Sequence, residues 1–132
     1  MPDGGFMATM LVVDDDETVR EALHDLFAEN HLCHIAGTAE QAFAHLETNI
    51  YDVVLTDISM PGLSGLELLA SIRQRWPNTP VIIISGINDH EYAQGFVKMG
   101  AFSYLVKPFR LEDVEDRVDK AIQHRQKLLE GR

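Results

Sequence analysis

Short apolar runs and longer amphipathic segments alternate along this chain. The three strongest runs are residues 10–13, 53–55 and 81–84, which are rich in Val, Ile and Leu. Continuous runs of this kind, bounded by polar or turn residues, are typical of strands that are buried on both faces of a sheet. Weaker runs lie at residues 34–36 and 104–106. The pattern therefore predicts five short strands.

The segments between these runs repeat their apolar residues at helical spacing, which predicts five helices. Asp16 is expected to cap the first helix, and Gly100 is expected to end the fourth. The apolar stripes are Val19, Leu23, Leu26 and Phe27; Ala39, Ala42, Phe43 and Leu46; Leu66, Leu69 and Ile72 with Trp76; Tyr92, Phe96, Val97 and Met99; and Leu111, Val114, Val118, Ala121 and Ile122. Strand–helix alternation repeated five times predicts an α/β fold, a doubly wound parallel sheet with helices on both faces.

Composition narrows the class of protein. The chain has 132 residues, 45% of them hydrophobic, which fits one globular domain. Its net charge of −10 argues against direct nucleic-acid binding, because phosphate backbones are held by Lys and Arg. No run approaches the ~18 apolar residues of a membrane span, and the N-terminus does not resemble a signal peptide. Since the single Cys33 cannot form an internal disulfide, we expect a cytoplasmic protein that does not contact membranes.

Acidic residues, a serine and a lysine directly follow the predicted strands. The carboxyl ends of parallel strands meet at one edge of the sheet, where α/β proteins bind their ligands. The residues that reach this edge are Asp14, Asp15 and Asp16 after the first strand, Asp57 at the end of the third, Ser85 and Gly86 after the fourth, and Lys107 after the fifth. Several carboxylates at one edge repel each other unless a cation compensates them.

These residue types together predict phosphoryl transfer. Mg²⁺ favours a site with one or two carboxylates, water and phosphoryl oxygens. Beside such an ion, Asp57 is a plausible nucleophile toward phosphorus. Lys107 and the Ser85 hydroxyl are suited to contact phosphoryl oxygens.

Four motifs resemble those of response-regulator receiver domains from two-component phosphorelays. They are Val-Val-Asp-Asp-Asp at 12–16, Val-Leu-Thr-Asp-Ile-Ser-Met-Pro-Gly at 54–62, Ile-Ser-Gly at 84–86 and Tyr-Leu-Val-Lys-Pro-Phe at 104–109. The resemblance covers roughly residues 9–129, nearly the whole chain. It implies the flavodoxin-like sheet order 2-1-3-4-5. It also implies a regulatory phosphoacceptor rather than an enzyme, one that assists only its own phosphorylation and dephosphorylation.

The resemblance assigns a role to each site residue. Asp57 is the phosphoacceptor and receives its phosphoryl group from a sensor histidine kinase or a phosphotransfer protein. Asp14, Asp15, Asp57 and the backbone carbonyl of Ser59 bind Mg²⁺, with Mn²⁺ as an alternative. Lys107 and Ser85 contact the phosphoryl group, and Ser85 and Tyr104 form the switch. The residues that tune the lifetime of the phosphoryl group are Ser59, Gly86 and Ile87.

The implied organisation is a flexible N-terminal segment (1–8), a receiver domain (9–129) and a tail or linker start (130–132). Phosphorylation is expected to act on an output domain or a downstream protein through the face formed by the fourth helix, fifth strand and fifth helix. The phosphorylated form could also form a homodimer. Ile87 is apolar where many relatives are polar, and we hypothesise that it slows self-dephosphorylation.

Three other interpretations remain open from the sequence. Asp14-Asp15-Asp16-Glu17-Thr18 also fits the D-x-D-x-T signature of haloacid dehalogenase-type phosphatases, in which Asp14 and Asp16 would serve; that interpretation leaves Asp57 unexplained. A flavin-binding module would need a glycine- and hydroxyl-rich loop where three aspartates stand. A receiver-like adaptor that is never phosphorylated would typically lack one of the key residues.

Overall fold

In the computed structural model, which describes residues 7–58 and 65–131, each apolar run is a strand of one parallel sheet. The strands are β1 (Thr9–Val13), β2 (Leu32–Ala36), β3 (Val53–Asp57), β4 (Val81–Ser85) and β5 (Ser103–Val106). Their order is β2-β1-β3-β4-β5, which confirms the predicted doubly wound arrangement. The three central strands β1, β3 and β4 carry the strongest apolar runs, because both of their faces are covered by helices.

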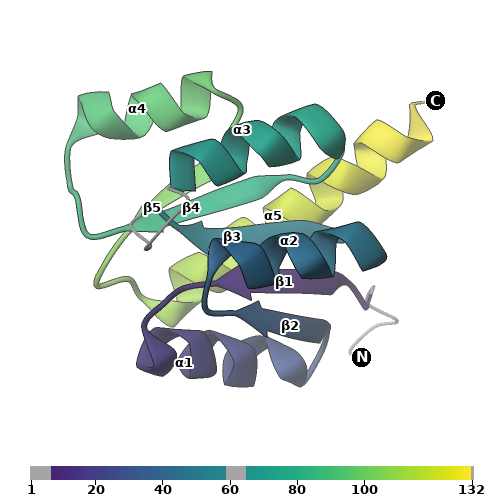
Figure 1. Ribbon diagram of the computed structural model, residues 1–132, viewed down its shortest axis with the longest axis horizontal. Coiled ribbons are helices and arrows are strands. Elements are labelled where there is room, and N and C mark those ends of the chain that lie inside the picture. The colour runs from purple at the N-terminus through teal and green to yellow at the C-terminus, as the bar shows by residue number, and fades with distance from the viewer. Residues whose placement is uncertain (1–6, 59–64, 132) are drawn as a thin grey trace.

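Within residues 7–58 and 65–131, five helices connect and cover the strands (Figure 1). They are α1 (Glu17–Ala28), α2 (Ala39–Thr48), α3 (Gly65–Arg75), α4 (His90–Lys98) and α5 (Leu111–Glu130). Helices α2, α3 and α4 pack on one face of the sheet, around Leu11, Val54 and Ile83. Helices α1 and α5 pack on the other face, around Val12 and Leu55. In the part of the chain that the structure describes, no helix is long and apolar enough to cross a bilayer.

Local signals define several helix ends as expected. The Asp16 side chain accepts hydrogen bonds from the backbone N–H groups of Thr18 and Val19, and so caps α1. Gly100 follows the end of α4 with φ +102°, a left-handed conformation that favours glycine. An added Cβ there would also lie 2.8 Å from Nε of Arg73. Both predictions are confirmed.

Three of the predicted apolar stripes are wrong in part. On α5, Leu111 is 44% exposed, although the rest of its stripe is buried. On α4 only Phe96 is buried, while Tyr92, Val97 and Met99 are 41–50% exposed. On α3 the buried position next to Leu69 is Leu68, and Leu66 is exposed. Spacing alone places such residues on one face, but it does not say how much of that face another element covers.

Strand register brings the functional residues to one edge. Val13 of β1 pairs with Thr56 of β3, Asp57 of β3 with Ile84 of β4, and Ser85 of β4 with Val106 of β5. The four strands therefore end at nearly the same level. Whatever directly follows them shares one surface.

Candidate functional site

Three carboxylates meet at the carboxyl edge of the sheet. Asp14 directly follows β1 and is fully buried, Asp57 ends β3 and is 7% exposed, and Asp15 is exposed. One oxygen from each lies within 4.8 Å of the others. Two unit charges at that separation repel by about 3.5 kcal/mol near a protein surface. The sheet thus assembles a strongly anionic cluster at the predicted place.

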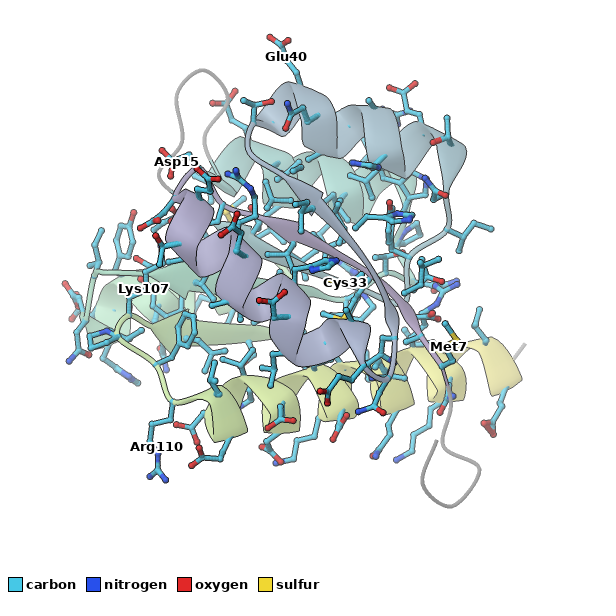
Figure 2. All side chains as sticks on the ribbon, turned by 90° about the horizontal axis from the view of Figure 1, so that it is seen from below. Met7, Asp15, Cys33, Glu40, Lys107 and Arg110 are labelled. Carbon is cyan, nitrogen blue, oxygen red and sulfur yellow. The ribbon has the colours of Figure 1, made fainter. Side chains whose placement is uncertain are left out.

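Lys107 supplies a positive charge to this cluster. Its Nζ lies 3.0 Å from Oδ2 of Asp14 and 3.5 Å from Oδ2 of Asp57. Asp15 and Lys107 lie at the same end of the molecule in Figure 2, opposite Met7. Burial by itself lowers the pKa of the Lys107 ammonium, but the hydrogen bonds and charges of Asp14 and Asp57 outweigh it and raise the pKa overall. Lys107 therefore stays charged at the site.

The Asp14 carboxylate is fixed on both oxygens. Oδ1 accepts a hydrogen bond from the backbone N–H of Asp16 at 2.9 Å, and Oδ2 accepts from Lys107. Burial raises the pKa of the Asp14 carboxyl above its ordinary value and the Asp57 charge adds to the rise, although the two hydrogen bonds oppose it. A raised pKa in the presence of a salt bridge shows that the buried charge is only partly compensated.

Asp16 does not belong to the carboxylate cluster of the described residues. Its side chain faces the start of α1, where Oδ1 lies 2.9 Å from the backbone nitrogen of Thr18. The phosphatase interpretation needs Asp14 and Asp16 to act together. The structure instead places Asp57 beside Asp14.

Ser85 and Tyr104 both bond to the backbone of Ile87. Ser85 is 1% exposed, and its Oγ accepts from the N–H of Ile87 at 3.0 Å. The Tyr104 hydroxyl donates to the Ile87 carbonyl at 2.9 Å, and the Tyr104 ring lies against Tyr92 and Phe96. Burial raises the pKa of the Tyr104 phenol, so it remains a donor. The connection from β4 to α4 is thus linked to both predicted switch residues.

Of the three predicted tuning residues, Gly86 and Ile87 are described by the structure and Ser59 is not. Gly86 is exposed, with open space where a Cβ would stand, and Ile87 is 45% exposed. Ser59, predicted as a metal ligand and a tuning residue, lies outside the described residues. Gly65 lies close to the backbone that directly follows β3, because an added Cβ would overlap the Cα of Ile58.

Arg20 is a neighbour of the site that the sequence pattern did not reveal. Its Nη1 donates to the backbone carbonyl of Asp14 at 2.9 Å. Arg20 is half-buried at the edge of the apolar stripe of α1, three residues before the buried Leu23, and helical spacing alone does not say what a charged residue contacts there. Its position in the sequence was the available signal. Arg20 stands in the first turn of the helix that follows Asp14, and that turn lies beside the end of the strand.

The donor set of the cluster fits Mg²⁺ or Mn²⁺. Carboxylate oxygens are the hard ligands that these ions prefer, and the described residues of the cluster include no thiolate or imidazole. Asp14, Asp15 and Asp57 are the residues that would hold the ion. A cation bound there would oppose the rise that burial and the Asp57 charge cause in the pKa of Asp14.

Comparison with known proteins identifies the family. The family model for the response regulator receiver domain matches residues 10–119. The DNA-binding transcriptional regulator NtrC of Salmonella typhimurium is 39% identical over 122 residues, covering 92% of this chain and 26% of the relative. The response regulator protein FleR of Pseudomonas aeruginosa is 37% identical over 112 residues, covering 84% and 24%. The chain thus spans about a quarter of the length of these curated relatives.

Solved structures agree with the sequence comparison. NtrX from Brucella abortus in complex with ATP superposes with a TM-score of 0.89 at 30% identity, covering 95% of this chain and 29% of that one. The BeF3-activated receiver domain of DrrB superposes with a TM-score of 0.83 at 26% identity, covering 89% and 99%. Its fold, its strand-end residues and these similarities together show that the chain belongs to the response regulator receiver domain family.

Proposed function

We propose that Asp57 accepts a phosphoryl group from the phosphohistidine of a sensor histidine kinase or a phosphotransfer protein. The observation that carries the proposal is the cluster of Asp14, Asp15 and Asp57 at one edge of the sheet, with Lys107 paired to Asp14 and Asp57. Three carboxylates held this close are costly for the fold, which favours a site kept for a ligand. Membership of the receiver family supports the same assignment.

The reaction is a direct transfer. An Asp57 Oδ attacks phosphorus, the new O–P bond forms as the N–P bond breaks, and the bonding electron pair returns to the donor imidazole. Bound Mg²⁺ would neutralise charge on the attacking carboxylate and on the phosphoryl oxygens. Lys107 is within reach of both Asp14 and Asp57, so its ammonium can turn to a phosphoryl oxygen without leaving the site.

The switch is proposed to begin at Ser85. A new phosphoryl group gives the Ser85 hydroxyl and the Lys107 ammonium a strong acceptor that exists only in the modified state, so the equilibrium shifts. Two charge-assisted hydrogen bonds at about 1.5–3 kcal/mol each approach the ~5.5 kcal/mol that a nearly complete switch requires. Because Ile87 contacts Ser85 and Tyr104, movement of Ser85 is transmitted to Tyr104 and α4.

The output surface is proposed to be the face formed by α4, β5 and α5. A groove of about 440 Å³ lies there, lined by residues that include Val97, Phe102, Tyr104 and Arg117. Val97, one of its lining residues on α4, is exposed. An exposed apolar face of this kind suits an output domain, a downstream protein or a second phosphorylated copy of this chain. Ser59, Gly86 and Ile87 are proposed to tune how long the phosphoryl group survives.

The relatives suggest a larger setting for this domain. NtrC is described as a DNA-binding transcriptional regulator, and this chain covers 26% of its length. We propose that the chain regulates an output of similar kind without binding nucleic acid itself. Its net charge of −10 supports the second half of that statement.

Incubation with acetyl phosphate, with and without Mg²⁺, tests the acceptor by intact mass. We expect a Mg²⁺-dependent phosphoryl adduct on the wild type and on the matched control Asp16→Asn, and none on Asp57→Asn. An adduct that persists in Asp57→Asn and disappears in Asp14→Asn would favour the phosphatase interpretation instead. The absence of an adduct on the wild type would favour the adaptor that is never phosphorylated.

A further inference from the structure

The guanidinium of Arg20 fixes the main chain at the acidic cluster. The Asp14 N–H donates to the carbonyl of Ala36 at 3.1 Å, and the Asp14 carbonyl accepts from Arg20 Nη1 at 2.9 Å. The peptide groups before and after Asp14 are therefore both held. The second of them leads directly into Asp15, so the contact with Arg20 sets the direction in which Asp15 leaves the strand.

Gly37 provides the space that Arg20 occupies. A Cβ added at Gly37 would lie 2.9 Å from Nη1 of Arg20 and 3.5 Å from its Cζ. The Gly37 N–H donates to Oε1 of Gln41 at 2.8 Å, which holds this part of the chain in place. The first turn of α1 thus reaches the end of β1 across a backbone that carries no side chain. The hydrogen bond between Arg20 and the Asp14 carbonyl can therefore be disturbed by replacing Arg20 or by adding a side chain at Gly37.

We infer that Arg20 is a positioning residue for the metal site, acting through Asp14 and Asp15 rather than touching the ion. The inference rests on the proposed function. Without the Arg20 contact, repulsion between the carboxylates favours rotation of the 14–15 peptide and of Asp15 away from Asp57. Groups that orient ligands in this way, without binding the metal, typically change metal affinity by 10–100-fold when they are replaced.

A plain electrostatic role makes the opposite prediction. A fixed cation beside the site would repel Mg²⁺, so its removal would strengthen binding. Replacement by Lys keeps the charge but loses the planar, rigidly directed N–H groups. The Lys variant therefore separates position from charge.

The test is isothermal titration calorimetry, which measures the Kd of the metal-free protein for Mg²⁺ and for Mn²⁺. We expect the Kd to rise about 10-fold in Arg20→Met and several-fold in Arg20→Lys. Gly37→Ala retains the arginine but displaces it, and should weaken binding in the same direction. The double variant Arg20→Met/Gly37→Ala should have the same Kd as Arg20→Met, because both substitutions remove the same contact. Arg110→Met, on an exposed arginine that pairs with Glu112, is the matched control and should bind like the wild type.

A second readout needs no metal. Amide hydrogen exchange at Asp16, whose N–H donates to Asp14 Oδ1, should accelerate in Arg20→Met and Gly37→Ala. Unchanged Kd values together with unchanged exchange would overturn the inference, as would an Arg20→Lys variant that matches the wild type while Arg20→Met binds more tightly. Failure of the wild type to bind Mg²⁺ would instead contradict the proposed function, and the exchange measurement would still decide whether Arg20 orders the turn.

Discussion

The two ends of the parallel sheet both enclose charged side chains, partly buried at one end and more deeply buried at the other, and they balance these charges differently. At the amino end, the Asp52 carboxylate accepts from the backbone N–H of Thr9 at 2.8 Å and from Nε of Arg125 at 3.1 Å, and Arg125 also donates to the carbonyl of Asn78. At the carboxyl end, three carboxylates lie close together and Lys107 pairs with two of them, Asp14 and Asp57. One end is matched charge for charge, and the other carries an excess of negative charge.

This difference separates structure from function. A buried ion pair whose remaining hydrogen bonds are made joins elements of the fold, here α5 with the starts of β1 and β3. A surplus of like charge serves no such purpose. At Asp14 burial raises the pKa of the carboxyl, and the charge of Asp57 adds to the rise. Imbalance, rather than burial of charge, therefore marks the functional end of the sheet.

The largest expected effect comes from breaking the matched end. Arg125→Met leaves Asp52 partly buried without its ion partner and should lower the free energy of unfolding by about 2–3 kcal/mol, since both side chains retain some solvent contact. Urea unfolding measures this loss. Mg²⁺ binding should not change. The control Arg110→Met breaks an exposed pair and should cost no more than about 0.5 kcal/mol; equal losses in the two variants would contradict the comparison.

Gly65→Ala tests the steric requirement at the functional end. The added Cβ would overlap Cα of Ile58 and lie 2.8 Å from the carbonyl oxygen of Asp57, so the backbone of the acceptor strand must shift. We expect a loss of about 2 kcal/mol in unfolding free energy and a slower phosphorylation by acetyl phosphate. The control Gly95→Ala, with open space in α4, should keep its phosphorylation rate and gain up to ~1 kcal/mol. A normal rate in Gly65→Ala would show that the site tolerates the shift.

The functional end was largely predictable from the sequence, and the reason is topological. Parallel strands end at one edge, so the residues that follow the apolar runs had to meet there. The sequence therefore placed Asp14, Asp57 and Lys107 together, and the resemblance supplied the strand order that the structure confirms.

The matched end and the α4 surface were not predictable in the same way. Asp52 and Arg125 are 73 residues apart, and neither stands at a position that periodicity distinguishes. Exposure of Val97 and Met99 depends on how far α4 lies from its neighbours, which side-chain spacing does not encode. Arg20 escaped notice because its partner is a backbone carbonyl rather than a side chain.

A smaller effect of opposite sign is expected from neutralising one carboxylate of the cluster. Asp15→Asn removes like-charge repulsion and should raise the unfolding free energy of the metal-free protein by about 0.5 kcal/mol, because Asp15 is exposed and screened. Asp52→Asn at the matched end should instead lower it. Urea unfolding in low salt, repeated with Mg²⁺, measures both. A loss of stability in metal-free Asp15→Asn would mean that the cluster is not in surplus.

The pH dependence of stability should differ between the ends, with the smallest effect in this series. His31 Nδ1 accepts from the Ala8 N–H at 3.0 Å, which requires an unprotonated nitrogen. Burial lowers the pKa of His31 below its ordinary 6.5, although Asp119 and Asp52 oppose the shift. The unfolded chain thus takes up the proton more readily, and stability present above pH 6.5 is lost as the pH falls toward the lowered pKa.

The contribution of Asp14 to the pH dependence of stability has the opposite sign. Because its pKa is raised, the folded state takes up a proton before the unfolded chain does, so acidification stabilises the carboxyl end. Gln at position 31 offers an amide oxygen to the Ala8 N–H at every pH. Urea unfolding between about pH 7.5 and pH 5.5 should therefore show a shallower decline in His31→Gln than in the wild type. Part of the decline should persist, because burial and the charge of His45 also lower the pKa of His34. A decline as steep as that of the wild type would mean that the His31 contact does not hold the start of β1 in solution.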